Sequence, residues 1–256
     1  MKKIKTVILA GGKGSRLSEE TSIIPKPMVR IGNIPIIEHV MNIYSDQGFT
    51  DFILCLGYKQ EIIKQYFLDY NLNNSDFSID LSTNTITKYN YKKKNWKITF
   101  VDTGKNTLTG GRLLKVKSYL QNDNIFLLTY ADGLANVDIN EIIKFHASGA
   151  QAVTLTAVQK AGKFGTFQMD GNFITSFKEK PIDDYINGGF FCMSNKVFDY
   201  LKDEDLPDTL DRLAKDKQLM TYKHHGDWEC MDTINDKMKL EEIWNSGNAF
   251  WGKNEK

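Results

Sequence analysis

The sequence predicts an α/β fold: a doubly wound, Rossmann-like mixed sheet with a mostly parallel core, antiparallel additions and a β-hairpin arm. Short apolar runs alternate with segments of helical periodicity between Ile4 and Leu68, which is the order of βαβα units. Such units close with right-handed crossovers and give parallel strands. Later in the chain, strand-like runs follow one another without a helix between them, which predicts the antiparallel additions.

The first two strand–helix units have the clearest patterns. Ile4–Ala10 is short, rich in β-branched residues and ended by glycine, as buried parallel strands are. Ile34–Gly48 carries apolar residues at helical spacing and ends at its glycine. Asp51–Leu56 then predicts a second buried strand and Gln60–Leu68 a second helix, so we expect the two strands to pair in parallel.

Residues 71–95 break this rhythm. The segment is rich in Asn, Ser, Thr and Tyr, and its runs Phe77–Leu81 and Thr85–Tyr89 alternate weakly between apolar and polar residues. This pattern predicts a β-hairpin extension. Because no linker or internal repeat interrupts the chain, we expect residues 1–256 to form one domain that includes the hairpin.

The remaining elements are predicted from the same periodicities. The expected strands are Trp96–Val101, Ile125–Tyr130 and Ala152–Val158, and the expected helices are Gly110–Leu120, Ile139–Ser148 and Thr233–Asn245. Three further runs, Gly165–Met169, Asn172–Lys178 and Gly188–Met193, are expected to add antiparallel strands to the sheet.

Composition excludes several classes of protein. With 41% hydrophobic and 25% charged residues, a chain of 256 residues can bury a core. The net charge of +1 is spread along the sequence, so neither nucleic acid nor a membrane is expected as a partner. The three cysteines are far apart and no apolar run reaches the roughly 20 residues of a membrane span. We therefore expect a cytoplasmic protein in a reducing compartment.

A glycine-rich turn follows the first strand. Gly11, Gly12 and Gly14 could curl the backbone around an anion and present N–H groups to a phosphate. The Walker pattern is absent, since no Gly-Lys-Ser/Thr closes the loop. The dinucleotide pattern is incomplete, because Leu17 replaces its third glycine and no acidic residue ends the second strand.

Positive charge gathers around this turn. Lys13 and Arg16 lie in the loop, and Lys26 follows between Pro25 and Pro27. The two prolines restrict the backbone on either side of Lys26 and so orient its ammonium group. Several cations that converge on one glycine loop indicate a triphosphate ligand.

These segments resemble the sugar-phosphate nucleotidyltransferase family, whose members join a nucleoside triphosphate to a sugar 1-phosphate. The matching segments are Leu9–Leu17 (LAGGKGSRL), Ser18–Thr21, Pro25–Pro27, Gly57–Lys59, Val101–Gly104, Thr109–Arg112, Phe177–Pro181 (FKEKP), Ile186–Phe190 (INGGF) and Met231–Thr233. They cover nearly the whole chain and are most similar to the members that make CDP-glucose. The resemblance implies CTP and glucose 1-phosphate as substrates, Mg²⁺ as cofactor and a homo-oligomer, to which residues 71–95 and Phe250–Trp251 could supply apolar area.

The resemblance also implies which residues bind the nucleotide. They are Leu9, Ala10, Gly11, Gly12, Lys13, Gly14, Ser15, Arg16, Lys26, Thr107, Thr109, Gly110, Gly111 and Arg112. Arg16 and Lys26 are expected to be catalytic: Arg16 would hold the leaving phosphates, and Lys26 would bring the two anions together. In the resembling family Thr109–Arg112 faces the base, so backbone N–H groups freed by Gly110 and Gly111 could read cytosine edges. Considered without the resemblance, the segment is also typical of a helix-entry turn capped by Thr109.

Two aspartates are candidate metal ligands. Asp132 follows the buried strand Ile125–Tyr130, and Asp232 precedes the last helix. Mg²⁺ prefers one or two carboxylates together with phosphate oxygens and water. The residues alone leave a turn role open for Asp132 and favour a helix N-cap for Asp232. The resemblance implies that the two form the metal pair, although Ala131 stands where the family usually has glycine.

A second cluster would bind the sugar phosphate. The resemblance assigns Gly165, Glu179, Lys180, Asn187 and Gly188 to it. The ammonium of Lys180 suits a phosphate, and the carboxylate and amide oxygens of Glu179 and Asn187 suit sugar hydroxyls. A lone Glu-Lys-Pro segment is more typical of a surface turn.

Three other functions are considered. A nicotinamide-linked oxidoreductase would need the missing third glycine and acidic residue. A nucleotide-binding module without activity would not need both aspartates and both lysines. A nucleotidyltransferase with another nucleotide or sugar fits equally well, because no single residue identifies cytosine or glucose. Nucleotidyl transfer to a sugar phosphate needs no activated side-chain nucleophile, and the sequence contains no G-x-S-x-G motif.

Overall fold

A seven-stranded sheet forms the centre of the computed structural model, which describes residues 4–90, 93–159, 166–170, 173–178 and 185–252. In spatial order its strands are β14 (Leu219–His224), β10 (Val153–Gln159), β13 (Tyr185–Ser194), β8 (Ile125–Tyr130), β1 (Lys5–Leu9), β4 (Asp51–Leu56) and β7 (Lys97–Asp102). Within this sheet, β13 pairs antiparallel with both β8 and β10, and the other pairs are parallel. The predicted mixed, mostly parallel sheet is thereby confirmed.

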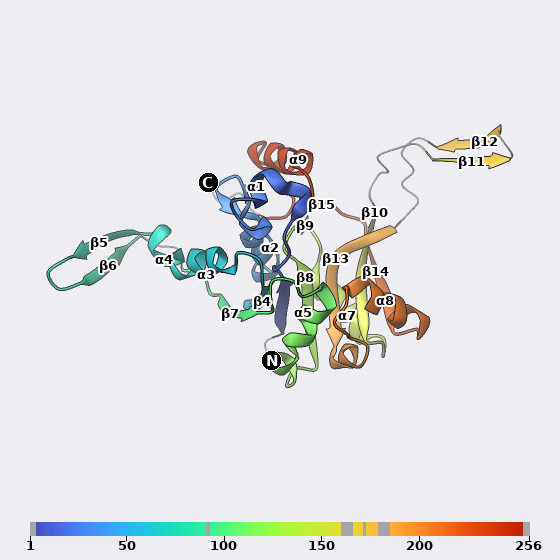
Figure 1. Cartoon of the computed structure of the whole chain (residues 1–256), viewed down its shortest axis with the longest axis horizontal. Coiled ribbons are helices and arrows are strands. Elements are labelled where there is room, and N and C mark those ends of the chain that lie inside the picture. Colours follow the sequence, from blue (N-terminus) through green and yellow to red (C-terminus); the bar gives the residue numbers. More distant parts are fainter. Residues whose placement is uncertain (1–3, 91–92, 160–165, 171–172, 179–184, 253–256) are drawn as a thin grey trace.

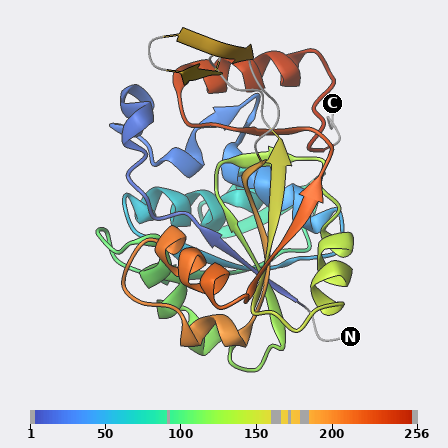
Figure 2. The ribbon, with the colours of Figure 1, turned by 90° about the vertical axis from the view of Figure 1, so that its right-hand side faces the viewer.

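Helices cover both faces of the sheet, as a doubly wound fold requires. One face carries α2 (Ile36–Ser45), α3 (Gln60–Leu68) and α7 (Ile139–Ala147), and α9 (Ile234–Asn245) packs into the same core cluster beyond the strand ends (Figure 1). The other carries α5 (Thr109–Lys115), α6 (Lys117–Leu120), the 3-10 helix η3 (Asn195–Asp199) and α8 (Leu206–Lys215). Alternate residues of one strand serve the two layers: Ile8 packs in the first, and Val7 and Leu9 in the second. Figure 2 shows α7 and α8 on opposite sides of the sheet.

Short elements complete the chain. They are η1 (Ser15–Leu17), α1 (Ser18–Thr21), η2 (Lys26–Met28), β2 (Arg30–Ile31), β3 (Ile34–Pro35), α4 (Tyr70–Asn73), β9 (Gly133–Ala135) and β15 (Trp228–Cys230). The helix expected over Gly110–Leu120 is interrupted at Val116, which separates α5 from α6. Over the described residues, none of the helices combines the length and apolar character needed to cross a bilayer.

Two hairpins stand apart from the sheet. β5 (Asp76–Asp80) and β6 (Thr85–Tyr89) form the predicted arm, which projects from one side of the molecule in Figure 1. β11 (Thr166–Asp170) and β12 (Phe173–Lys178) pair with each other and project from the opposite side. Their predicted addition to the central sheet was wrong. β10 pairs with β13 and β14, and β13 pairs with β10 and β8, so neither of these two strands has a free side for the hairpin.

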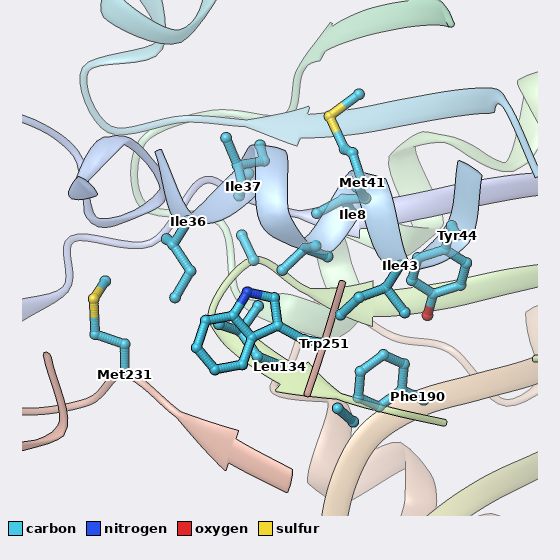
Figure 3. Packing of buried hydrophobic residues seen from close by; sticks show 14 of the residues in the cluster. Ile8, Ile36, Ile37, Met41, Ile43, Tyr44, Leu134, Phe190, Met231 and Trp251 are labelled. Atoms are coloured by element: carbon cyan, nitrogen blue, oxygen red, sulfur yellow. The ribbon is translucent and has the colours of Figure 1, made fainter. Parts of the chain in front are cut away.

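The larger core cluster surrounds α2, which buries Ile36, Ile37, Met41 and Tyr44 (Figure 3). Trp251 packs into the same cluster and is only 3% exposed. Its expected role in covering a partner surface was therefore wrong for this side chain, because the chain's own core already covers it.

His39 on α2 links this core to the C-terminal segment. The imidazole Nδ1 accepts a hydrogen bond from Trp251 Nε1 at 3.1 Å, and Nε2 lies 2.9 Å from the carbonyl oxygen of Ile31. Together these contacts fit a neutral ring that carries its proton on Nε2. Burial lowers the pKa of His39 to about 4.

Acid should therefore weaken the fold through His39. The unfolded chain binds a proton near the ordinary pKa of 6.5, whereas the folded ring stays neutral down to about 4. The stability contributed by the neutral His39 ring is therefore fully present above the pKa of the unfolded state, and it is lost as the pH falls towards the pKa of the folded state. Between about pH 7 and pH 5 we expect a loss of about 2 kcal/mol in the free energy of unfolding. Urea titrations of the wild type and His39→Gln at both pH values would measure it, and an equal loss in the variant would contradict it.

Candidate active site

A cavity of about 470 Å³ opens where β1 and β8 end. Ligand sites in open α/β sheets gather at such carboxyl ends. Ten of the residues predicted to bind the nucleotide line it: Leu9, Ala10, Gly11, Gly12, Lys13, Gly14, Lys26, Thr107, Thr109 and Arg112. Ser15, Arg16, Gly110 and Gly111 are not part of this lining.

The glycine loop bends tightly past Lys26. Gly14 has a φ of +62°, a region that side chains with a Cβ rarely adopt. A Cβ at this position would lie 2.9 Å from Cβ of Lys26. The Gly14 carbonyl accepts hydrogen bonds from the Leu17 N–H and the Thr21 hydroxyl, both at 3.0 Å. Glycine at this position therefore lets the loop and Lys26 border one cavity.

Arg112 is buried beneath the loop, with 3% exposure. Its guanidinium donates to the carbonyl oxygens of Gly11 at 2.9 Å and Leu56 at 3.1 Å, and to the Thr103 hydroxyl at 2.7 Å. Burial lowers its pKa from the ordinary value. A Cβ at Gly11 would collide with this guanidinium, and one at Gly57 would lie 2.6 Å from it. Arg112 therefore ties the first turn to two neighbouring strand ends.

Gly110 and Gly111 do not present free N–H groups to the cavity. Both donate to the Glu204 carbonyl, at 2.9 and 3.4 Å. A Cβ at Gly110 would lie 2.8 Å from that oxygen, and one at Gly111 would collide with the Asp203 carboxylate. The two glycines thus allow the loop before α8 to approach α5. The expectation that their backbone reads the base is not supported by this arrangement.

The predicted metal carboxylates meet at Lys26. Its ammonium lies 2.6 Å from Oδ2 of Asp132 and 2.7 Å from Oδ1 of Asp232. Thr233, not Asp232, caps α9 through a capping box with Asp236, so the Asp232 carboxylate is not needed as a helix cap. Burial opposes the charge of Lys26, but the two carboxylates outweigh it and raise the pKa above the ordinary value.

Asp132 and Asp232 fit a divalent cation. Both carboxylates reach one ammonium, so they can reach one metal ion, and phosphate oxygens and water would complete an octahedral shell. Among the described residues no cluster of three or more His, Cys, Asp or Glu side chains could hold a metal. A site with two carboxylates suits Mg²⁺ better than Zn²⁺.

A second cavity, of about 730 Å³, adjoins the first and shares Tyr130 and Asp132 with it. Arg16, Asn187 and Gly188 line it, so two predicted sugar-phosphate residues and one predicted catalytic residue face the same space. The Arg16 guanidinium lies 3.6 Å from Asp232. The other predicted sugar-phosphate residues, Gly165, Glu179 and Lys180, lie outside the described residues.

Several lining residues were not predicted from the sequence. Lys105, Asn106, Tyr130 and Asp205 border the first cavity, and Asp205 accepts a hydrogen bond of 3.0 Å from the Thr109 hydroxyl. Burial raises the pKa of Tyr130 to about 12, and Asp132 adds to the shift. Tyr130 could have been found as the last residue of a buried strand directly before Asp132. Asp205 could not, because its partner is 96 residues away.

The doubly wound sheet, the glycine-rich turn at its strand ends and the paired aspartates fit a nucleotide-dependent transferase. The family model described as "Nucleotidyl transferase" matches residues 5–246, and the chain belongs to this family. It is 46% identical to "Probable glucose-1-phosphate cytidylyltransferase" of Bacillus subtilis, over 97% of this chain and 99% of that protein. It is 44% identical to the glucose-1-phosphate cytidylyltransferase of Salmonella typhi, over 97% of this chain and 98% of that protein.

The fold is also found in solved structures. The crystal structure of HddC from Yersinia pseudotuberculosis has a TM-score of 0.68 and 25% identity to this chain, over 94% of this chain and 99% of that one.

Proposed function

We propose that this chain transfers the cytidylyl group of CTP to α-D-glucose 1-phosphate and releases pyrophosphate. The product, CDP-glucose, would serve nucleotide-sugar and polysaccharide biosynthesis. The observation that carries the proposal is the position of Lys26, whose ammonium joins Asp132 and Asp232 where the two cavities meet. The choice of cytosine and glucose is supported by the names of the relatives from Bacillus subtilis and Salmonella typhi.

The reaction needs positioning more than side-chain nucleophiles. A phosphate oxygen of the sugar phosphate forms a bond to the α-phosphorus of CTP, and the bond to the β-phosphate oxygen breaks. This nucleophile is already ionised at neutral pH, since the second pKa of a phosphate ester is about 6. The cavity lined by Gly11–Gly14 would hold CTP, and the cavity with Asn187 and Gly188 the sugar phosphate.

Charge neutralisation would come from three groups. Lys26 borders the first cavity beside Asp132, where the two anions would meet, and so can reduce their repulsion. Arg16 lines the second cavity, but its guanidinium lies 3.6 Å from Asp232, which contacts Lys26 of the first cavity, so we assign it to the leaving phosphates where the two cavities meet. Asp132 and Asp232 would hold Mg²⁺, which neutralises phosphate charge when bound.

A pyrophosphate-release assay tests the function. CTP, UTP, dTTP, ATP and GTP are each combined with glucose, mannose and galactose 1-phosphates, with and without Mg²⁺. We expect the highest kcat/KM for CTP with glucose 1-phosphate and no release without metal. A higher kcat/KM for another pair would change the assigned substrates. Nucleotide binding without release in every combination would favour a non-catalytic binding module.

Arg16→Ala should lower kcat by about 10²–10³-fold, the usual cost of one preorganised charge donor. The side chain is 78% exposed, so little loss of stability is expected. Arg30→Ala is the matched control, because Arg30 is also exposed and donates to the Asn33 carbonyl away from both cavities. Normal turnover by Arg16→Ala would show that the assigned role is wrong.

We also propose that residues 1–256 act as one cytoplasmic nucleotidyltransferase domain and form a homo-oligomer. The family model supports the extent of the domain, since it spans residues 5–246. The cysteines Cys55, Cys192 and Cys230 form no disulfide, which is typical of a reducing compartment. Exposed apolar side chains on the arm, such as Phe77 and Leu81, favour an interface there. Sedimentation analysis of the full chain, with and without the arm residues changed to serine, would test the association.

A further inference from the structure

The metal site already holds a cation, the ammonium of Lys26. Both of its carboxylate contacts are within 2.7 Å, and its side chain is 14% exposed. The carboxylate oxygens that face Lys26 are the atoms a divalent ion would need. A metal ion and the ammonium therefore compete for the same two groups.

We propose that Lys26 is an internal counter-ion that keeps divalent metal out of the site until a polyphosphate draws the ammonium away. This inference depends on the proposed function only for the identity of the anion. Metal and nucleotide would then bind together, each raising the affinity for the other, as linkage requires. The substrate-free protein would bind metal weakly.

The local charges support this competition. Asp132 and Asp232 carry two negative charges, and Lys26 places one positive charge between them. Arg16 adds another at 3.6 Å from Asp232. The net charge of these four side chains is close to zero, so the site attracts a divalent ion only weakly. Once the ammonium moves to a phosphate, the carboxylates repel each other and their affinity for a cation rises.

The backbone around Lys26 supports the same conclusion. Pro25 has an extended backbone, with φ −68° and ψ 147°, and Lys26 begins η2. The Val29 N–H then donates to the Lys26 carbonyl at 3.1 Å. The main chain at Lys26 is therefore fixed, and only the Lys26 side chain needs to move to release the two carboxylates. Gly11–Gly14 border the same cavity as the side chain, so a phosphate bound there would be within its reach.

Metal binding without nucleotide tests the proposal directly. Mn²⁺ is titrated into the substrate-free full chain, and free Mn²⁺ is followed by electron paramagnetic resonance. Lys26→Met keeps much of the side-chain volume but removes the charge, and we expect its Mn²⁺ affinity to exceed that of the wild type by about tenfold or more. Adding Asp132→Asn to this variant should remove the gain.

Lys13→Met is the matched control. Lys13 lines the same cavity, but among the described residues it makes no ion pair with Asp132 or Asp232. Its loss should change the Mn²⁺ affinity by less than about threefold, because the carboxylates keep their partner. Equal gains in both variants would mean a general charge effect and would overturn the proposal.

Thermal unfolding with and without Mg²⁺ gives a second measurement. Mg²⁺ should raise the Tm of Lys26→Met and leave that of the wild type nearly unchanged, since a ligand stabilises only the state that binds it. A Lys26→Met protein that folds only with metal would also support the proposal. Equal Mn²⁺ affinity in the folded wild type and Lys26→Met would overturn it. Neither measurement uses a substrate, so a failed transferase assay would leave this result interpretable.

Discussion

Asp132→Asn should lower kcat by about 10³-fold or more, because the change keeps the side-chain shape and removes half of the paired charge that would hold Mg²⁺. Lys26 would keep Asp232 at 2.7 Å, so the fold should survive. Steady-state kinetics at saturating Mg²⁺ measures the effect. A normal Tm and circular dichroism spectrum would show that the loss is not one of folding.

Asp123→Asn is the matched control for this experiment. It breaks another lysine–aspartate pair, with Lys5 at 2.8 Å, at the beginning of β1 and away from both cavities. We expect kcat to stay within about twofold of the wild type, since ion pairs outside the site contribute mainly to stability. If Asp132→Asn kept a tenth of the wild-type kcat, a role for this carboxylate in holding the metal would be excluded.

Arg112→Met should lower both stability and nucleotide affinity. It removes three hydrogen bonds that a buried cation donates, to Gly11, Leu56 and Thr103. A hydrogen bond from a charged group contributes about 1.5–3 kcal/mol, but the acceptors keep other partners after the substitution. We therefore expect the free energy of unfolding to fall by about 3 kcal/mol in total. Because the loop would lose its anchor, the KM for CTP should rise about 10-fold or more.

Two measurements separate an anchor from a direct ligand. A direct contact between Arg112 and the nucleotide would raise KM while the Tm stayed normal, whereas an anchor changes both. Arg112→Lys keeps the charge but cannot span three acceptors, so it should restore only part of the stability. A normal Tm in Arg112→Met would contradict the anchoring role.

Local sequence patterns predicted most of the sheet and its first helices. Asp51–Leu56 and Gln60–Leu68 coincide with β4 and α3, because a short buried run and a helical repeat each have a distinct periodicity. α8 was not predicted, although Leu206, Leu210 and Leu213 form a helical stripe that is buried. The Asp residues between these leucines obscured the helical pattern in the sequence.

Such local patterns could not predict contacts between residues far apart in the sequence. The Arg112 guanidinium finds the Gly11 carbonyl 101 residues earlier, and nothing near Arg112 in the sequence indicates that partner. The two glycines before it were interpreted as exposing backbone N–H groups, but their purpose is close packing against the Glu204 carbonyl. Asp232 was favoured as a helix cap by local pattern alone, and only the capping box of Thr233 shows that it is not needed there.

The reversed direction of β13 has a consequence for how this enzyme can diversify. Because it runs against β8, its beginning, with Asn187 and Gly188, lies at the edge where β1 and β8 end. In the proposed function, the nucleotide would be bound by the early part of the chain, and the sugar phosphate by a segment that lies more than half the chain length further on. Selection could exchange one sugar for another at this strand while the machinery for the nucleotide stays intact.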